Sequence, residues 1–333
     1  VEGACQSHGK GKVAWDDYLA QQGRFSPEPA CDFYNRYDSD LELCERFGMN
    51  GIRVSIAWSR IFPNGGVGEP NAEGVAFYHN LFASCRAHGV EPYVTLHHFD
   101  SPAALYANGD FLNRDTIDAF EAYARFCFDE YPEVTRWFTF NEIAAATLNR
   151  YVEGTWPQGK NECLQAQHNM MLAHARAVLA YKQGGYPGTI GVIHALEYKY
   201  PYDPACPGDI QAAKNDDVLQ NRLLLDATFR GDYAPDTLQI IEHLCQASNG
   251  SVEFLDDDLS IMRRAAQLND CLGINYYQSR FLKAFDGETD LHHNGTGDKG
   301  TGRWRVAGVG ERKMERYGDA FLREIAEYEE DAQ

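Results

Sequence analysis

Short β-rich runs alternate with helical segments along most of this chain, and this alternation restricts the possible folds more than any other feature. Phe33, Tyr37, Leu41 and Cys44 recur at helical spacing, and similar patterns span residues 75–85, 117–127 and 170–181. The β-rich runs are residues 51–58, 92–96, 134–140, 189–193 and 271–277. Strands separated by helices in this way predict a parallel sheet with helical crossovers.

Two architectures satisfy this alternation, an open doubly wound sheet and a closed (β/α)8 barrel. The doubly wound sheet should have a glycine-rich phosphate turn after its first strand, and the sequence has none there. Polar residues lie in or just past several strands instead: Arg53, His98, Asn141, Glu142, Asn275 and Tyr277. Because polar strand ends are typical of barrel enzymes, we predict an α/β chain with a TIM barrel in one domain, residues 1–333. We expect five complete strands, with strands 7–8 and most of strand 1 missing from this sequence.

Charge and cysteine usage exclude several classes of protein. The net charge of −19 opposes binding to nucleic acid or anionic lipid, and no run of apolar residues is long enough to span a membrane. The chain shows no export leader, and its nine cysteines form no C-x-x-C pair. Several cysteines occupy apolar helix positions. We therefore expect free thiols, no metal, and a cytoplasmic location.

The sequence Thr139-Phe-Asn-Glu142 is the sharpest local signal for chemistry. A carboxylic acid at a strand end, next to an amide, suits proton donation to a glycosidic oxygen. Burial against Trp137 or Phe140 would raise the pKa of Glu142 toward neutrality. The alternative is that Glu142 only caps the helix that follows.

The histidines do not suggest a metal site. His97 and His98 are adjacent on a strand and point to opposite faces, so they cannot chelate one ion together. We expect one to contact a sugar hydroxyl and the other to pack in the core. His168 and His174 are six positions apart on a helix, which does not fit the zincin spacing, and we interpret them as core histidines.

A glycine-rich loop at residues 294–302 contains Lys299. It looks like a phosphate cradle, but Lys299 is followed by Gly300 instead of Ser or Thr, so it is not a Walker motif. A flexible hairpin loop is the favoured interpretation, with Lys299 at the entrance of a site.

Several segments together resemble glycoside hydrolase family 1. They are Val1-Glu-Gly-Ala4, residues 50–63 (Asn-Gly-Ile-Arg-Val-Ser through Ile-Phe-Pro), Val94-Thr-Leu-His-His-Phe-Asp100, Phe138-Thr-Phe-Asn-Glu142 and Leu272-Gly-Ile-Asn-Tyr-Tyr277. Within the family the chain is most similar to the enzymes that cleave 6-phospho-β-galactosides. Segments 109–114, 168–171, 199–204 and 284–288 carry that closer resemblance, together with His293-Asn-Gly and Lys299-Gly.

The resemblance implies a role for each candidate residue. Glu142 matches the general acid/base, Asn141 the amide that binds the sugar 2-hydroxyl, and His98 a histidine that binds ring hydroxyls. The residues that match those around the catalytic nucleophile are Arg53, Asn275 and Tyr277. The family reaction needs no cofactor.

Three parts of the family pattern are missing from this sequence: a glutamine just before Val1, the nucleophile in a Thr-Glu-Asn-Gly-like motif, and a later Ser, Lys and Tyr cluster for the sugar phosphate. From Glu311 onward the sequence reads as a charged helix that does not follow the family.

We therefore expect a retaining glycosidase that cleaves 6-phospho-β-galactosides such as phosphorylated lactose. A 6-phospho-β-glucosidase, or an unphosphorylated β-glucosidase or β-galactosidase, is the near alternative. The alternative from another class is a catalytically dead truncated fragment. The oligomeric state is not predicted.

Overall fold

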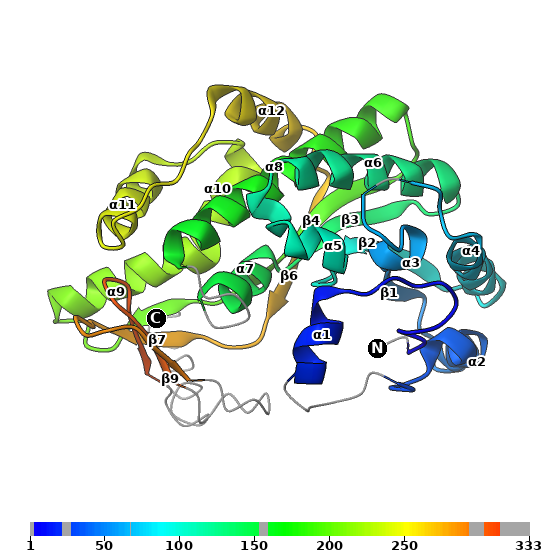
Figure 1. Ribbon diagram of the computed structural model, residues 1–333, viewed down its shortest axis with the longest axis horizontal. Helices are drawn as coiled ribbons and strands as arrows, with labels where there is room; N and C mark the ends of the chain where they lie inside the picture. Colours follow the sequence, from blue (N-terminus) through cyan, green and yellow to red (C-terminus); the bar gives the residue numbers. More distant parts are fainter. Residues whose placement is uncertain (1–2, 22–27, 67, 153–158, 293–302, 314–333) are drawn as a thin grey trace, which may run out of the picture.

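The computed structural model describes residues 3–21, 28–66, 68–152, 159–292 and 303–313. Its centre is a five-stranded parallel sheet in the order β1-β2-β3-β4-β6 (Figure 1). The strands are β1 (Gly51–Ser55), β2 (Glu91–His97), β3 (Arg136–Asn141), β4 (Thr189–Leu196) and β6 (Cys271–Tyr276). All five predicted strands are confirmed. The first ends earlier than its apolar run, because a short helix begins at Trp58.

Helices connect successive strands and give the sheet its parallel order. The four predicted helices are confirmed as α2 (Phe33–Arg46), α4 (Ala72–Ala87), α6 (Asp115–Glu130) and α8 (Lys160–Gly184). The other α-helices are α1 (Ala14–Gln21), α3 (Trp58–Ile61), α5 (Ala103–Ala107), α7 (Ile143–Thr147), α9 (Pro207–Asp217), α10 (Leu223–Arg230), α11 (Pro235–Gln246) and α12 (Asp256–Ala266). Three short segments are helical but not α-helical: the 3-10 helix η1 (Asp110–Leu112) and the π-helices η2 (Leu148–Val152) and η3 (Val218–Arg222).

A second sheet lies next to α9 and was not predicted from the sequence (Figure 1). It has the order β5-β7-β10-β9-β8 and consists of β5 (Lys199–Pro201), β7 (Arg280–Lys283), β8 (Asp290–His292), β9 (Arg303–Val306) and β10 (Gly310–Lys313). The expected charged helix from Glu311 is wrong for its first three residues, because β10 pairs there with β7 and β9. The expected loop with Lys299 lies outside the described residues.

Aromatic side chains fill the core between the sheet and α6. Trp58 stacks on Tyr123 with ring centroids 4.9 Å apart, and Phe120 stacks on Phe140 of β3 at 4.4 Å. All four side chains are fully buried or nearly so. Each such ring removes apolar surface worth roughly 2–3 kcal/mol from water, so this cluster fixes the strand that leads into Glu142.

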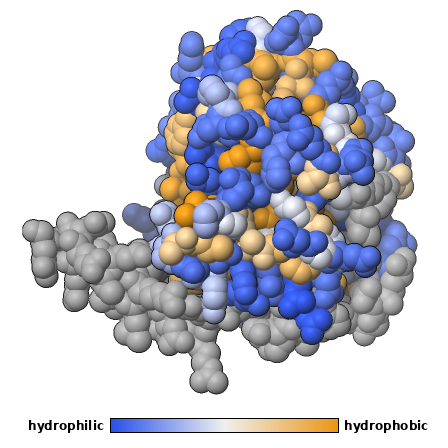
Figure 2. Space-filling view, turned by 90° about the vertical axis from the view of Figure 1, so that its left-hand side faces the viewer, coloured by the Kyte–Doolittle hydropathy of each residue, from blue (hydrophilic) through white to orange (hydrophobic). Residues whose placement is uncertain are grey.

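The outer surface is mixed in polarity. Figure 2 shows hydrophobic residues lying among hydrophilic ones on the side that faces left in Figure 1, where α9 and α11 lie. Phe229, Leu238 and Leu255 are among the exposed apolar side chains of α10–α12 and the loop between them. All nine cysteines are free, and four of them are buried, as predicted. No helix in the described ranges is long and apolar enough to cross a membrane.

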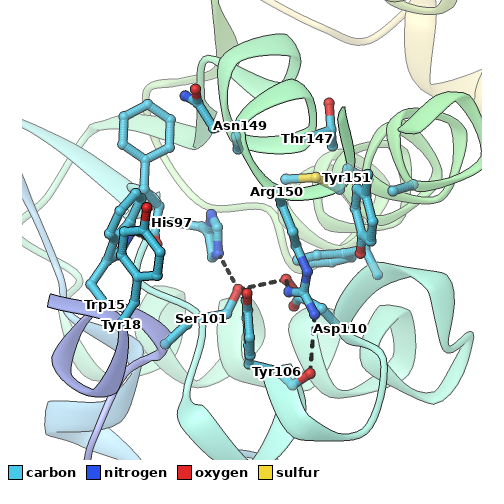
Figure 3. A pocket seen from close by; sticks show the side chains of 16 residues that line it. Trp15, Tyr18, His97, Ser101, Tyr106, Asp110, Thr147, Asn149, Arg150 and Tyr151 are labelled. Carbon is cyan, nitrogen blue, oxygen red and sulfur yellow. Dashed lines mark hydrogen bonds and ion pairs between the residues drawn. The ribbon is translucent and has the colours of Figure 1, made fainter. Parts of the chain in front are cut away.

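A buried ion pair supports the turn of chain that follows β3 and α7. Asp110 of η1 pairs with Arg150 of η2, and Arg150 also donates to the backbone oxygen of Tyr106 at 3.0 Å. Ser101 donates to Asp110 at 3.1 Å and bonds to Nε2 of His97 at 2.9 Å. Figure 3 shows this chain of contacts at the base of a pocket walled by aromatic rings. The pair fixes η2 relative to the loop after β2, close to the helix that begins after Glu142.

The histidines of α8 are buried, as predicted. His168 bonds to the hydroxyl of Tyr233 at 2.7 Å, and Nδ1 of His174 bonds to Thr139 of β3 at 2.8 Å. Burial lowers the pKa of His168 to about 4 and that of His174 to about 3. Both are therefore neutral in the folded protein at pH 7.

Stability should depend on pH through His174. A histidine in the unfolded chain binds a proton near pH 6.5, whereas folded His174 resists protonation until about pH 3. The unfolded state therefore binds more protons in this window, and stability falls as the pH drops below 6.5. Between pH 7 and pH 5, the free energy of unfolding of the unaltered chain should fall by about 2 kcal/mol more than that of His174→Gln.

Urea unfolding at both pH values measures this difference. His243→Gln is the matched control, because His243 is exposed on α11. It should keep the full loss of stability between the two pH values. An equal loss in the His174 variant and in the unaltered chain would contradict the prediction.

Candidate active site

Six of the predicted site residues lie within the described ranges, and they gather at or near the carboxyl ends of the parallel strands. Arg53 lies in β1, His98 follows β2, Asn141 ends β3, Asn275 lies in β6 and Tyr277 follows it. Glu142 comes directly after β3. Five of the six form one hydrogen-bond network, and His98 lies beside Arg53. Lys299 lies outside the described residues.

Glu142 is held at the turn where β3 passes into α7. Its backbone has a φ of 54°, in the left-handed region that few residues other than glycine adopt. Its N–H donates to the oxygen of Ile193 in β4 at 2.8 Å, and its carbonyl oxygen accepts from Ala146 at 3.0 Å. The β3–β4 register shifts between Phe138 and Asn141. Such a strained backbone at a strand end is typical of functional sites.

The side chain of Glu142 does not cap the following helix. Glu142 stands at the N-cap position of α7, yet its carboxylate makes no cap hydrogen bond. Oε1 instead accepts from Nδ2 of Asn275 at 2.5 Å and from the hydroxyl of Tyr277 at 3.4 Å. Within the described part of the chain, no hydrogen bond is recorded for Oε2. The carboxylate thus points toward the carboxyl end of β6, across β4 from its own strand.

Asn141 is buried, and its amide has a fixed orientation. Its Oδ1 accepts from Nη1 of Arg53 at 2.7 Å and from Nδ2 of Asn275 at 3.3 Å. Two donors on one oxygen identify that atom as the amide oxygen. Arg53 therefore links β1 to β3, and Asn275 links β6 to both Asn141 and Glu142.

The two adjacent histidines have different surroundings. His97 is buried against Phe111 and Phe140, and burial together with His98 lowers its pKa to about 3. His98 is partly exposed, and burial and the charge of Arg53 lower its pKa to about 4. It lines a hollow together with Arg53 and other residues. The expectation that one of the two packs in the core is confirmed for His97. The contact of His98 with a sugar hydroxyl stays a prediction.

Sequence reasoning missed two groups that support the site. The Asp110–Arg150 pair lies beneath the turn after α7, and only Asp110 fell within a segment noted for its resemblance. Glu197, directly after β4, binds Gln278 and Arg280 just past Tyr277. Neither has a local sequence signal, because each partner is tens of positions away.

The chain is similar in sequence to known proteins of one family. Residues 1–316 match the model of glycosyl hydrolase family 1. The chain is 54% identical to a 6-phospho-beta-galactosidase of Streptococcus equi subsp. zooepidemicus (strain H70) over 94% of its own length, and it covers 67% of that relative. It is 52% identical to a 6-phospho-beta-galactosidase of Staphylococcus aureus (strain MRSA252), covering 95% of this chain and 68% of the relative.

The chain also resembles solved structures in fold. The beta-glucosidase BglU from Micrococcus antarcticus is 32% identical, with a TM-score of 0.74 over 85% of this chain. Beta-glucosidase 2 from Trichoderma reesei is 30% identical, with a TM-score of 0.76 over 87% of this chain. The chain covers 60% and 63% of these two structures, less than two thirds of either. The predicted (β/α)8 fold class is confirmed, and the chain belongs to glycosyl hydrolase family 1.

Proposed function

We propose that this chain is the acid/base-bearing part of a retaining β-glycosidase, with Glu142 as the general acid and base. The observation that carries the proposal is the placement of the Glu142 carboxylate. It lies at a strand end and is bonded to Asn275 of β6 and to Tyr277 just past β6, instead of capping α7. A carboxyl group fixed in this way can deliver a proton to a defined position.

The reaction has two steps. In the first, the Glu142 carboxyl group gives its proton to the glycosidic oxygen while a second carboxylate attacks the anomeric carbon, and the alcohol leaves. In the second, the Glu142 carboxylate takes a proton from water, which releases the sugar and the second carboxylate. The two carboxyl groups must lie about 5 Å apart. Arg53, Asn275 and Tyr277 are the groups that would surround the second carboxylate, by resemblance to the family.

Neighbouring groups suit the binding of a polyhydroxylated sugar. Asn141 presents an amide whose oxygen is bound by Arg53, so its orientation is set before substrate arrives. His98 has a pKa lowered to about 4, so at pH 7 its ring is neutral and has one donor and one acceptor nitrogen. We assign Asn141 to the 2-hydroxyl and His98 to ring hydroxyls. The reaction requires no cofactor or metal.

We propose a 6-phospho-β-galactoside as the substrate. The names of the relatives that are 52–54% identical support this choice, whereas the solved relatives named as beta-glucosidases, which are about 30% identical, keep the unphosphorylated sugar as the alternative. A phosphate dianion must enter a protein of net charge −19, so it needs local positive charge. Lys299 is the residue that we propose for this charge. Nine free thiols suit the reducing cytoplasm, where we place the protein.

A second candidate function is sugar binding without turnover. The absence of a Thr-Glu-Asn-Gly motif from the sequence favours it for the 333-residue polypeptide alone. An assay of that polypeptide distinguishes the two, because a retaining reaction needs both carboxylates.

The role of Glu142 predicts a specific kinetic pattern. The test uses an enzyme in which this sequence is joined to the remaining third of a full-length relative. There, Glu142→Gln should lower kcat/KM for a poor leaving group by roughly 10²–10⁴. A dinitrophenyl glycoside should still form the glycosyl-enzyme, because its leaving group needs little protonation. Azide should then restore part of the slow second step.

Glu42→Gln is the matched control for this kinetic test, because Glu42 is exposed on α2. It should leave both substrates unaffected. Equal losses on both substrates in the Glu142 variant, with no recovery in azide, would argue against the acid/base role.

Substrate choice is tested in the same joined enzyme with a matched pair of aryl glycosides. The aryl 6-phospho-β-galactoside should be cleaved with the higher kcat/KM, and Lys299→Ala should raise its KM by roughly tenfold or less. The kcat should stay nearly constant, because the contact is the same in the ground and transition states. A preference for the unphosphorylated galactoside or glucoside would replace the phospho-specific proposal with the β-glycosidase alternative.

A further inference from the structure

Three residues, 277–279, connect β6 of the parallel sheet to β7 of the second sheet, which begins at Arg280. The first of them, Tyr277, donates its hydroxyl hydrogen bond to Glu142 at 3.4 Å. Yet the Tyr277 residue is 64% exposed, so burial in the core does not hold its ring in place. How the backbone of this connection is held therefore contributes to the position of its hydroxyl.

Glu197 binds this connection at two points. Its carboxylate accepts from Nε2 of Gln278 at 3.0 Å. It also accepts from Nε of Arg280 at 3.1 Å and from Nη2 of the same guanidinium at 3.3 Å. Gln278 is the residue next to Tyr277, and Arg280 begins β7. One carboxylate thus restrains both the chain beside Tyr277 and the far end of the connection.

Glu197 is itself firmly anchored. It follows β4, and its backbone exchanges two hydrogen bonds with the side chain of Asn221, at 3.2 Å and 2.7 Å. Its side chain is only 13% exposed and contacts Nζ of Lys199 at 2.9 Å. Lys199 in turn contacts Asp216 at 2.8 Å. The anchor therefore belongs to the rigid part of the fold and not to the connection that it holds.

The charge of Glu197 is stable across the working pH range. Burial alone would raise the pKa of Glu197, but the positive charges of Lys199, Arg280 and Arg312 outweigh burial and hold the pKa well below its usual range. A charged acceptor makes stronger hydrogen bonds than a neutral one, by roughly a factor of two. The restraint on Gln278 and Arg280 is thus a charge-assisted one.

We propose that Glu197 is a positioning residue, which holds residues 277–280 so that the Tyr277 hydroxyl stays on the Glu142 carboxylate. Among the described residues, Glu197 makes no hydrogen bond or ion pair with the Glu142 carboxylate, and it acts through Gln278, Arg280 and Tyr277. The catalytic meaning of this restraint rests on the proposed role of Glu142, whereas the restraint itself can be tested without any activity.

The test uses the titration of Tyr277 as a report of its contact with Glu142. Burial, the charge of Glu142 and their hydrogen bond raise the pKa of Tyr277, and Arg53 opposes them. In the 333-residue chain with carbon-13 at the tyrosine ζ position, NMR follows the ionisation of each phenol, and Tyr277→Phe identifies the signal. Glu142→Gln gives the pKa of Tyr277 without the negative charge.

We expect Glu197→Gln to lower the pKa of Tyr277 to the value found in Glu142→Gln. Gln278→Ala should lower the pKa of Tyr277 part of the way. This substitution leaves no buried charge unpaired, so the variant is expected to fold. Asp216→Asn is the matched control: it disturbs the same buried network at Lys199 and Arg312 but touches neither Gln278 nor Arg280. It should leave the Tyr277 titration unchanged.

Circular dichroism establishes which variants are folded. If Glu197→Gln is not folded, the Tyr277 titration in Gln278→Ala alone tests the proposal. Three results would overturn the proposal. They are an unchanged Tyr277 titration in the folded Glu197 and Gln278 variants, an equal decrease in Asp216→Asn, and no response to Glu142→Gln. None of them bears on glycosidase activity, so the positioning role can fail while the proposed reaction stands.

Discussion

The site depends on the parallel order of the central strands. Because every strand in the sheet runs the same way, residues far apart in sequence meet at one edge. Asn275 and Glu142 are separated by 133 positions, yet they share a hydrogen bond. Arg53 reaches Asn141 across 88 positions in the same way. Without parallel pairing from β1 to β6 these side chains would not form a site.

The rest of the structure keeps this edge rigid. Aromatic packing between α6 and the sheet fixes β3 from one side, and the Asp110–Arg150 pair fixes the turn after α7. On the other side, Glu197 ties the chain after β6 to the end of β4. The left-handed backbone of Glu142 costs on the order of 1 kcal/mol, and it is maintained because its neighbours on both sides are held.

Much of this could be predicted from sequence, for physical reasons. Buried parallel strands are continuous apolar runs, and amphipathic helices repeat every three to four residues, so both have local signals. The polar residues just past the strands pointed to one edge of the sheet, and the family motifs imply the roles that we propose for them. The structure joins Arg53, Asn141, Glu142, Asn275 and Tyr277 in one network. The second sheet had no such signal, because its strands are three or four residues long. Gly310–Lys313 carries charges that fit a solvated helix equally well, and only pairing with β7 and β9 makes it a strand.

The central claim is that Glu142 serves a reaction that retains the configuration of the anomeric carbon. The most direct measurement is proton NMR of the sugar released in the first minutes of hydrolysis, before the anomers equilibrate. It requires the enzyme in which this sequence is joined to the remaining third of its relatives' length. Two successive inversions predict that the β-anomer is formed first and the α-anomer appears later by mutarotation. If the α-anomer is formed first, the reaction inverts, and Glu142 does not act as the acid and base of a retaining glycosidase.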